Sequence, residues 1–166
     1  MYKRQTFLDF TLQQEYFAID GKTLLILCEE GEEEYDMDKL KLTNTVVEVI
    51  EDEEDLTPQR LAAMDIIHQP ERVVIEYNGM WLLQDLAEAL PENWLVYQCI
   101  ATADGTTALT YARDNSMRSL MLDKIARSEL IVFNRAEAVN NDDARQELHK
   151  LVRQASRKCD IAYEFK

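Results

Sequence analysis

The sequence has few cysteines and no long apolar run. Its three cysteines, Cys28, Cys99 and Cys159, are far apart and odd in number, and no C-x-x-C motif occurs. This pattern is typical of a reduced, cytoplasmic protein rather than of a disulfide-linked secreted one. Because no apolar run is long enough to cross a bilayer and no signal peptide is visible, we expect a cytoplasmic protein that does not insert into a membrane.

Basic residues are also scarce. The chain has 18 Lys and Arg against 32 Asp and Glu, which gives a net charge of −14. Such a charge argues against non-specific binding to nucleic acid or to anionic membranes, so we expect no nucleic-acid partner. It permits binding to cations or to a basic protein. The negative charge is concentrated, because 13 of the 32 acidic residues lie between Glu29 and Asp55.

The length and the alternation of apolar patterns predict one domain of the α/β class. A chain of 166 residues can bury a substantial core. Strand-like apolar runs occur at residues 22–28, 46–50, 73–76, 94–101, 130–133 and 161–165. Helical patterns lie at residues 6–17, from Thr57-Pro58 onward, at 80–90, within 106–127 and after Asn140 or Asn141. Strands that alternate with helices predict a mostly parallel sheet with helices on both faces.

The stretch from Arg72 to Gly79 is the strongest candidate for a functional strand end. Its three consecutive β-branched residues, 73–75, predict a strand buried on both faces, and Glu76 lies at the carboxyl edge of that strand. In open parallel sheets, ligands bind beyond the carboxyl ends of the strands. The alternative is a strand-to-helix turn with a solvated glutamate, and these residues alone favour that alternative.

Two other apolar strands also end in polar groups. One ends in Cys28-Glu29-Glu30-Gly31, and the other ends in Asn134-Arg135-Ala136-Glu137. Each has a simpler interpretation as well, because an acidic run is usually a solvated loop and a polar tetrapeptide after a strand is usually a turn.

Together, the three strand ends resemble the CobW/HypB/UreG family of P-loop GTPases, which insert or deliver metals into enzymes and cofactors. The family's N-E-x-G-E and following Asp correspond to residues 28–32 and Asp36, with Cys28 in place of Asn. Its E-x-x-G corresponds to Glu76 and Gly79, and its N-K-x-D corresponds to residues 134–137. The resemblance runs from about Thr6 to the C-terminus, and each motif alone is weak.

The resemblance implies a guanine-nucleotide site. Glu137 would accept hydrogen bonds from the N1–H and the exocyclic amine of guanine, and Asn134 would face the base edge. Arg135 would lie over the base face. Gly79 would belong to the nucleotide-binding set, and Glu76 would be catalytic, because it would orient the attacking water or couple the phosphate state to loop position.

The resemblance also implies a magnesium site. Glu29, Glu32 and Asp36 would lie near the phosphates and bind Mg²⁺ through water, because hard carboxylate oxygens suit this ion. The implied cofactors are therefore GTP and Mg²⁺.

The main departure from the family is at the N-terminus. The phosphate cradle of the family, G-x-x-x-x-G-K-[ST] at the start of a helix, has no match in the chain. Thr6-Phe7-Leu8 looks like the residues that follow that cradle. We therefore expect residues 1–5 to be a non-native remnant and residues 6–166 to be a three-layer P-loop NTPase-like domain that lacks its first strand and P-loop. Backbone N–H groups, the helix dipole and the Lys of the cradle supply most of the phosphate affinity.

A second departure concerns transferred metals. Many relatives carry C-x-C-C where this chain has residues 48–52, which contain no thiol, and His68 and His149 have no metal-ligand partners at helical spacing. A thiolate transfer site is therefore not supported, and we expect the cysteines to be small buried apolar residues.

We therefore hypothesise that the chain is the GTP-binding and GTP-hydrolysing domain of a CobW-like metal chaperone or metal-handling protein. We expect residues 1–166 alone to be inactive, because the P-loop is missing. Its implied partners are a guanine nucleotide and either a client metal enzyme or a membrane permease. One alternative is an acidic α/β protein-interaction domain with a vestigial nucleotide site. A third interpretation is an α/β domain that shares only the fold.

Overall fold

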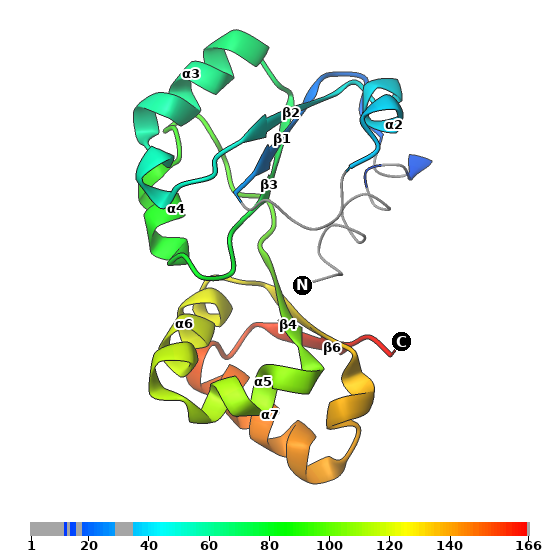
Figure 1. Cartoon of the computed structure of the whole chain (residues 1–166), viewed down its shortest axis with the longest axis vertical. Helices are drawn as coiled ribbons and strands as arrows, with labels where there is room; N and C mark the ends of the chain where they lie inside the picture. The colour runs from blue at the N-terminus through cyan, green and yellow to red at the C-terminus, as the bar shows by residue number, and fades with distance from the viewer. Residues whose placement is uncertain (1–11, 13, 16–17, 29–34, 166) are drawn as a thin grey trace. The chain divides into compact units, whose positions relative to one another are not determined.

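The computed structural model describes residues 12, 14–15, 18–28 and 35–165. The chain divides into two compact units (Figure 1). Unit 1 comprises Met1–Trp81 and Leu86–Asn93, and unit 2 comprises Leu82–Asp85 and Trp94–Lys166. None of the helices among the described residues is long and apolar enough to cross a membrane.

Unit 1 contains a parallel sheet of order β2-β1-β3. Its strands are β1 (Thr23–Leu27), β2 (Thr45–Val49) and β3 (Arg72–Glu76). Leu27 of β1 pairs in register with Val49 of β2 and with Glu76 of β3, so the three strands end at one edge. The backbone continues this ladder by one step beyond the strands, because Ile50 N–H donates to the Leu27 carbonyl and Cys28 N–H donates to the Glu76 carbonyl.

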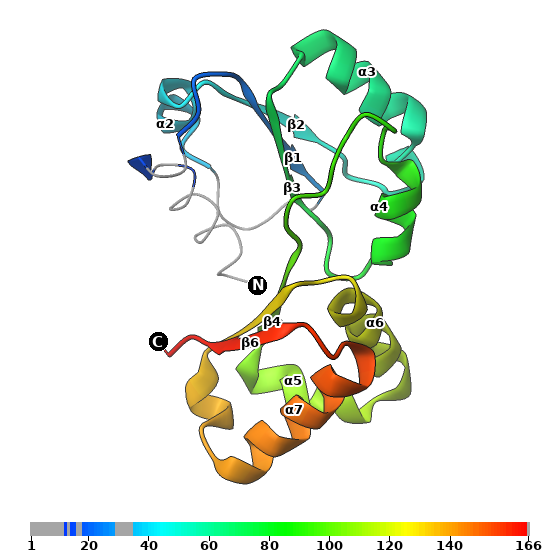
Figure 2. The same cartoon turned by 180° about the vertical axis from the view of Figure 1, so that it is seen from behind.

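Helices α2 (Met37–Leu42) and α3 (Pro58–His68) lie on opposite sides of this sheet (Figures 1 and 2). A short 3₁₀ helix, η2 (Glu53–Asp55), precedes α3. Thr57 caps α3 by accepting a hydrogen bond from Arg60 N–H, and Pro58 occupies the first turn, as the sequence predicts. The helix α4 (Leu83–Ala89) follows β3 in the chain.

Unit 2 contains a second parallel sheet, of order β4-β5-β6. Its strands are β4 (Ile100–Asp104), β5 (Leu130–Asn134) and β6 (Asp160–Tyr163). The helical elements are α5 (Gly105–Arg113), α6 (Asn115–Ala126), the 3₁₀ helix η3 (Ala136–Val139) and α7 (Asp142–Ala155). Asp114 ends α5 and caps α6, which splits the predicted helical stretch in two, and Asn141 caps α7. Both sheets are parallel throughout, which confirms the predicted α/β class.

The core of unit 2 lies between its sheet and its helices. Ile131 and Phe133 are buried, whereas the alternate residues of β5 are half-buried, so one face of the strand is covered. Buried residues from α5, α6, η3 and α7 complete this core: Ala108, Ala112, Ile125, Ala136, Val139, Ala144, Leu148, Leu151 and Val152. The period-2 burial of β5 differs from the fully buried strand that its unbroken apolar run suggests.

The strand that the sequence marks as the strongest functional candidate, β3, is not the central strand of its sheet. Among the described strands, β3 lies at the edge of its sheet, and Val73, Val74 and Ile75 are half-buried. The central strand is β1, in which Thr23, Leu24, Leu25 and Ile26 are all buried. The prediction that β3 is buried on both faces is therefore wrong, because an apolar run cannot by itself distinguish a central strand from an edge strand.

The predicted strand at 94–101 is shifted. The regular strand begins at Ile100, and residues 94–99 form no strand. Pairing with the neighbouring chain segment starts only where Glu129 N–H donates to the Cys99 carbonyl and Cys99 N–H donates to the Glu129 carboxylate. Leu95 and Tyr97 are exposed, so their apolar character does not reflect burial in a sheet.

The predicted helix at 80–90 is shorter, because α4 begins at Leu83. The Asn78 side chain accepts a hydrogen bond from Met80 N–H at 2.8 Å, and its carbonyl accepts one from Trp81 N–H. These bonds form a turn that delays the helix by three residues. The predicted helix at residues 6–17 lies almost wholly outside the described residues. The helix α2 was not predicted.

We expect the core of unit 2 to control its stability. Leu148 on α7 is fully buried, so Leu148→Ala should lower the free energy of unfolding by about 2–5 kcal/mol. The neighbouring His149 is exposed, and His149→Ala should change it by less than about 0.5 kcal/mol. Urea unfolding of both variants measures the difference. Equal effects of the two substitutions would contradict the placement of α7.

Candidate functional site

Glu76 is a buried carboxylate at the carboxyl edge of the unit 1 sheet. It is 6% exposed, and its Oε2 accepts a hydrogen bond of 2.6 Å from the Tyr35 hydroxyl. A buried carboxylate is costly unless it is hydrogen-bonded, so Tyr35 offsets the cost of placing a charge here. The Tyr35 ring packs against the cluster of Leu12, Leu25 and Leu40. The solvated glutamate that the local sequence favours is therefore not what the structure shows.

Tyr35 is the residue at this strand end that sequence reasoning missed. It lies at the end of the acidic run, next to Asp36, and no spacing rule connects it to Glu76, which is 41 positions away. Only the parallel register of β1 and β3 brings the two segments together. An aromatic residue inside a charged run is the one signal that could have drawn attention to it.

Cys28 lies beside Glu76 at the same edge. The thiol is fully buried. Burial, assisted by the negative charge of Glu76, raises the pKa of Cys28 from 9.0 to about 12. The thiol is therefore protonated at neutral pH, and its burial agrees with the prediction that Cys28 is a small buried residue.

Gly79 lies in the turn that follows β3 and is half-buried. Its φ is not positive, so the turn does not require glycine for a left-handed conformation. After this turn, the Tyr77 and Trp81 rings meet edge to face, with centroids 5.8 Å apart. The structure thus confirms a turn at Gly79, whereas its contact with a nucleotide stays a prediction.

The predicted magnesium ligands fall mainly outside the described residues. Glu29 and Glu32 lie there, and only Asp36 is described. Its side chain is exposed and its Oδ1 accepts a hydrogen bond from Asp38 N–H at 3.2 Å. Within the described part of the chain, no three His, Cys, Asp or Glu side chains lie close enough to hold a metal ion. The magnesium site stays a prediction.

At the carboxyl edge of the unit 2 sheet, Asp104 and Arg135 form an ion pair. Arg135 Nε donates to Asp104 Oδ1 at 3.0 Å, and the Arg135 Nη2 group contacts Asp104 Oδ2. Asp104 also caps α5, because it accepts hydrogen bonds from the N–H and the hydroxyl of Thr106. Arg135 has a left-handed backbone with φ 47°, an uncommon conformation for a residue that is not glycine.

Gly105 allows these groups to come together. A Cβ atom at this position would lie 2.8 Å from the carbonyl oxygens of both Asn134 and Arg135. Such a distance is too short for any side chain, and the obstructing atoms are backbone. The start of α5 can therefore approach the end of β5 closely only because residue 105 is glycine.

Asn134 and Glu137 differ sharply in their surroundings. The Asn134 Oδ1 atom is buried and has no hydrogen-bond partner among the described residues. Unsatisfied buried polar atoms are rare in folded proteins and often mark functional sites. Glu137 lies on η3 and is exposed. Asn134, Arg135 and Glu137 are therefore brought to one edge of unit 2, while Glu76 and Gly79 lie at the corresponding edge of unit 1.

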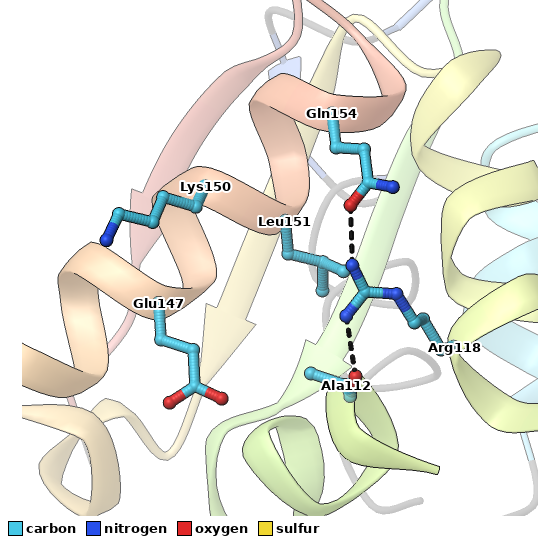
Figure 3. A pocket seen from close by; sticks show the side chains of 6 residues that line it. All are labelled: Ala112, Arg118, Glu147, Lys150, Leu151 and Gln154. Carbon is cyan, nitrogen blue, oxygen red and sulfur yellow. Dashed lines mark hydrogen bonds between the residues drawn. The ribbon is translucent and has the colours of Figure 1, made fainter. Parts of the chain in front are cut away.

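A pocket of about 140 Å³ lies elsewhere in unit 2, among α5, α6 and α7, and it is lined by Ala112, Arg118, Glu147, Lys150, Leu151 and Gln154 (Figure 3). Arg118 donates to the Ala112 carbonyl at 2.9 Å and to Gln154 Oε1 at 2.5 Å. These bonds tie α6 to α5 and α7. None of the predicted site residues lines this pocket, and its arginine has a structural role.

One short stretch of the chain partly resembles the phosphate cradle of the family. Gly21-Lys22-Thr23 has the last three letters of G-x-x-x-x-G-K-[ST], but position 16 is Tyr. Thr23 begins a strand rather than a helix, and its hydroxyl accepts hydrogen bonds from Arg72 Nε and Nη2. This tripeptide therefore offers no helix N-terminus to an anion.

Comparison with protein families relates the chain to a nucleotide-binding domain. The model for the CobW/HypB/UreG nucleotide-binding domain matches residues 17–162, which include all of the strand ends described above. Comparison with curated proteins and comparison with solved structures each found no match.

The pKa of Cys28 predicts a loss of stability in alkali. The unfolded thiol ionises near its ordinary pKa of 9.0, whereas the folded thiol ionises only near about 12, so the unfolded state binds fewer protons between these values. Stability should therefore fall as pH rises above about 9, by up to about 1.4 kcal/mol per pH unit from this group.

Urea unfolding of the wild-type chain and of Cys28→Ala between about pH 9 and pH 11 measures this contribution. At about pH 9 the variant should have a lower free energy of unfolding than the wild-type chain, because it lacks a buried side chain. Its free energy of unfolding should then fall less steeply as pH rises. Parallel curves would show that Cys28 titrates normally in the folded state.

Proposed function

Because the chain belongs to the CobW/HypB/UreG nucleotide-binding domain family, we propose that it forms the guanine-nucleotide-binding part of a CobW-like metal-handling protein. GTP, when bound, supplies the phosphoanhydride bond that such a protein hydrolyses. The observation that carries the proposal is the buried Oδ1 of Asn134, which has no hydrogen-bond partner in the described part of the chain and lies one turn from the exposed carboxylate of Glu137.

The chemistry of this pair fits guanine. The Watson–Crick edge of guanine carries two neighbouring donors, the N1–H and the exocyclic amine, and both Asn134 Oδ1 and the Glu137 carboxylate are acceptors. Glu137 accepts from the two donors, and Asn134 lies at the base edge. The buried Asn134 Oδ1 has no hydrogen-bond partner among the described residues, and because an unsatisfied buried acceptor is costly, this atom supports a polar ligand at this edge.

Glu76 is the proposed positioning group for hydrolysis. Phosphoryl transfer depends mainly on positioning and charge neutralisation. The Tyr35 hydroxyl holds one carboxylate oxygen of Glu76, so the orientation of the group is restricted. In the same proposal, Glu29, Glu32 and Asp36 bind Mg²⁺ through water, and the protein acts in the cytoplasm on a client metal enzyme or a permease.

One observation favours a second candidate function, an acidic protein-interaction domain. Glu51, Asp52, Glu53, Glu54 and Asp55 are consecutive and all exposed, and of these Asp55 pairs with Arg60. A surface of this kind attracts a basic partner, and salt weakens the attraction. This function needs no nucleotide, so nucleotide binding separates the two candidates.

The chain as printed should bind GTP only weakly. Its sequence contains no G-x-x-x-x-G-K-[ST], the element that supplies most of the phosphate affinity. Calorimetry with GTP and Mg²⁺ should detect no binding in the micromolar range. Joining a family P-loop strand and helix start ahead of Thr6 should bring binding into that range. Micromolar binding to residues 1–166 alone would show that the phosphates bind elsewhere.

The extended chain should prefer GTP over ATP by at least roughly tenfold. Adenine presents an acceptor at N1 and no amine at the adjacent carbon, so a bound adenine would cover the Glu137 carboxylate without donating to it, at a cost of about 1–3 kcal/mol. Glu137→Gln should reduce the preference without unfolding the chain, because Glu137 is exposed. If the extended chain binds GTP and ATP equally, and Glu137→Gln changes neither affinity, Glu137 does not read the base. The chain would then share only the fold of the family.

A further inference from the structure

Arg145 of α7 lies against two aromatic rings, those of Tyr163 at the end of β6 and of Phe165 just after it. Its Cζ atom is 5.0 Å from the centroid of the Tyr163 ring and 5.7 Å from that of the Phe165 ring. Its Nη2 donates to Asn140 Oδ1 at 2.6 Å, whereas its Nε is buried without a hydrogen-bond partner among the described residues. The rings therefore hold much of this guanidinium in place.

Phe165 is the exposed member of this stack. Tyr163 is half-buried, and its ring stacks on Phe133 of β5 with centroids 5.6 Å apart. Phe165 is 44% exposed, although the Arg145 guanidinium packs over its ring. A phenyl ring that is braced by a cation and still open to solvent is a suitable platform for a flat aromatic ligand.

The platform lies at the edge where Asn134 and Glu137 are found. Glu164 N–H donates to the Phe133 carbonyl, and Ala136 N–H donates to the Glu164 carbonyl, both at 2.9 Å. These two bonds join the residue before Phe165 to the turn that contains Asn134 and Glu137. Phe165 is thus one residue away from the backbone that carries the proposed guanine acceptors.

The proposed site needs a group that covers the face of the base. Arg135 is the residue for which the sequence predicts this role, but its guanidinium forms an ion pair with Asp104 at two points. That pairing fixes the plane of the guanidinium, so Arg135 can cover a base only in the orientation that Asp104 sets. Phe165 is an exposed ring at the same edge, and its orientation is not set by an ion pair.

We propose that Phe165 is the stacking platform for the purine base and that Arg145, which packs over the ring, holds it in place. This inference rests on the proposed nucleotide function. Stacking is tolerant of base identity because every base has a π face. Phe165 therefore contributes affinity for guanine and adenine alike, whereas Glu137 contributes the difference between them. The two roles are separable by experiment.

The test measures binding of GMP and of AMP to residues 1–166 by protein NMR, which detects millimolar affinity. GMP lacks the β- and γ-phosphates, so its binding reports the base side of the site. Phe165→Ala should weaken GMP and AMP by the same factor, about tenfold. Phe165→Trp should restore binding to both. Tyr111→Ala removes another exposed ring of unit 2, on α5, and should change neither affinity.

The outcomes distinguish this inference from the proposed function. If GMP shifts the amide signals of Asn134 and Glu137 and Phe165→Ala binds as tightly as the wild-type chain, the platform is wrong and the nucleotide function stands. If Phe165→Ala weakens GMP but not AMP, the ring acts in base selection rather than in stacking, and the inference also fails. If GMP shifts no signal of unit 2, both proposals are overturned.

Discussion

The close approach of Gly105 to the end of β5 is the constraint on which the arrangement of unit 2 depends. The backbone carbonyls of Asn134 and Arg135 occupy the space in which any side chain at residue 105 would lie. This contact brings the first turn of α5 beside the turn after β5. Asp104 can then serve two partners at once, the N-terminus of α5 and the Arg135 guanidinium. Removing the glycine would disturb the helix start, the ion pair and the left-handed Arg135 together.

The two sheets present carboxylates of opposite character at corresponding edges. Glu76 is buried and bound by a phenol, so its position is restricted and its charge is shielded from water. Glu137 is exposed on a short 3₁₀ helix. A group that must hold a fixed orientation gains from burial, whereas a group that must meet a ligand edge needs access. In the proposed function, positioning and recognition therefore fall to two residues of the same chemical type.

Local pattern predicted much of this molecule. Thr57-Pro58, Asn141 and the apolar runs at β1, β5 and β6 lie where the sequence indicates them, because caps and strand-forming residues act over a few positions. The polar ends of β3 and β5 were also predicted in this way, whereas residues 29–31 lie outside the described residues. Contacts over long separations were not predicted. Tyr35 meets Glu76, and Arg135 meets Asp104, through strand register, and Arg145 meets Phe165 through the packing of α7. An apolar run encodes neither. The half-buried β3 likewise reflects its neighbours rather than its own residues.

The strand orders have a consequence for how the chain folds as it is synthesised. In the order β4-β5-β6, each new strand pairs with the one made just before it, so the sheet can grow as the chain leaves the ribosome. In the order β2-β1-β3, β1 is the first of the described strands to be made and becomes the central one, and its second side pairs only after residues 72–76 have been translated. During that interval, the backbone N–H and C=O groups on one side of the apolar strand β1 are unpaired in the nascent chain. Such an edge is prone to aggregation, and a chaperone that binds it would protect the chain.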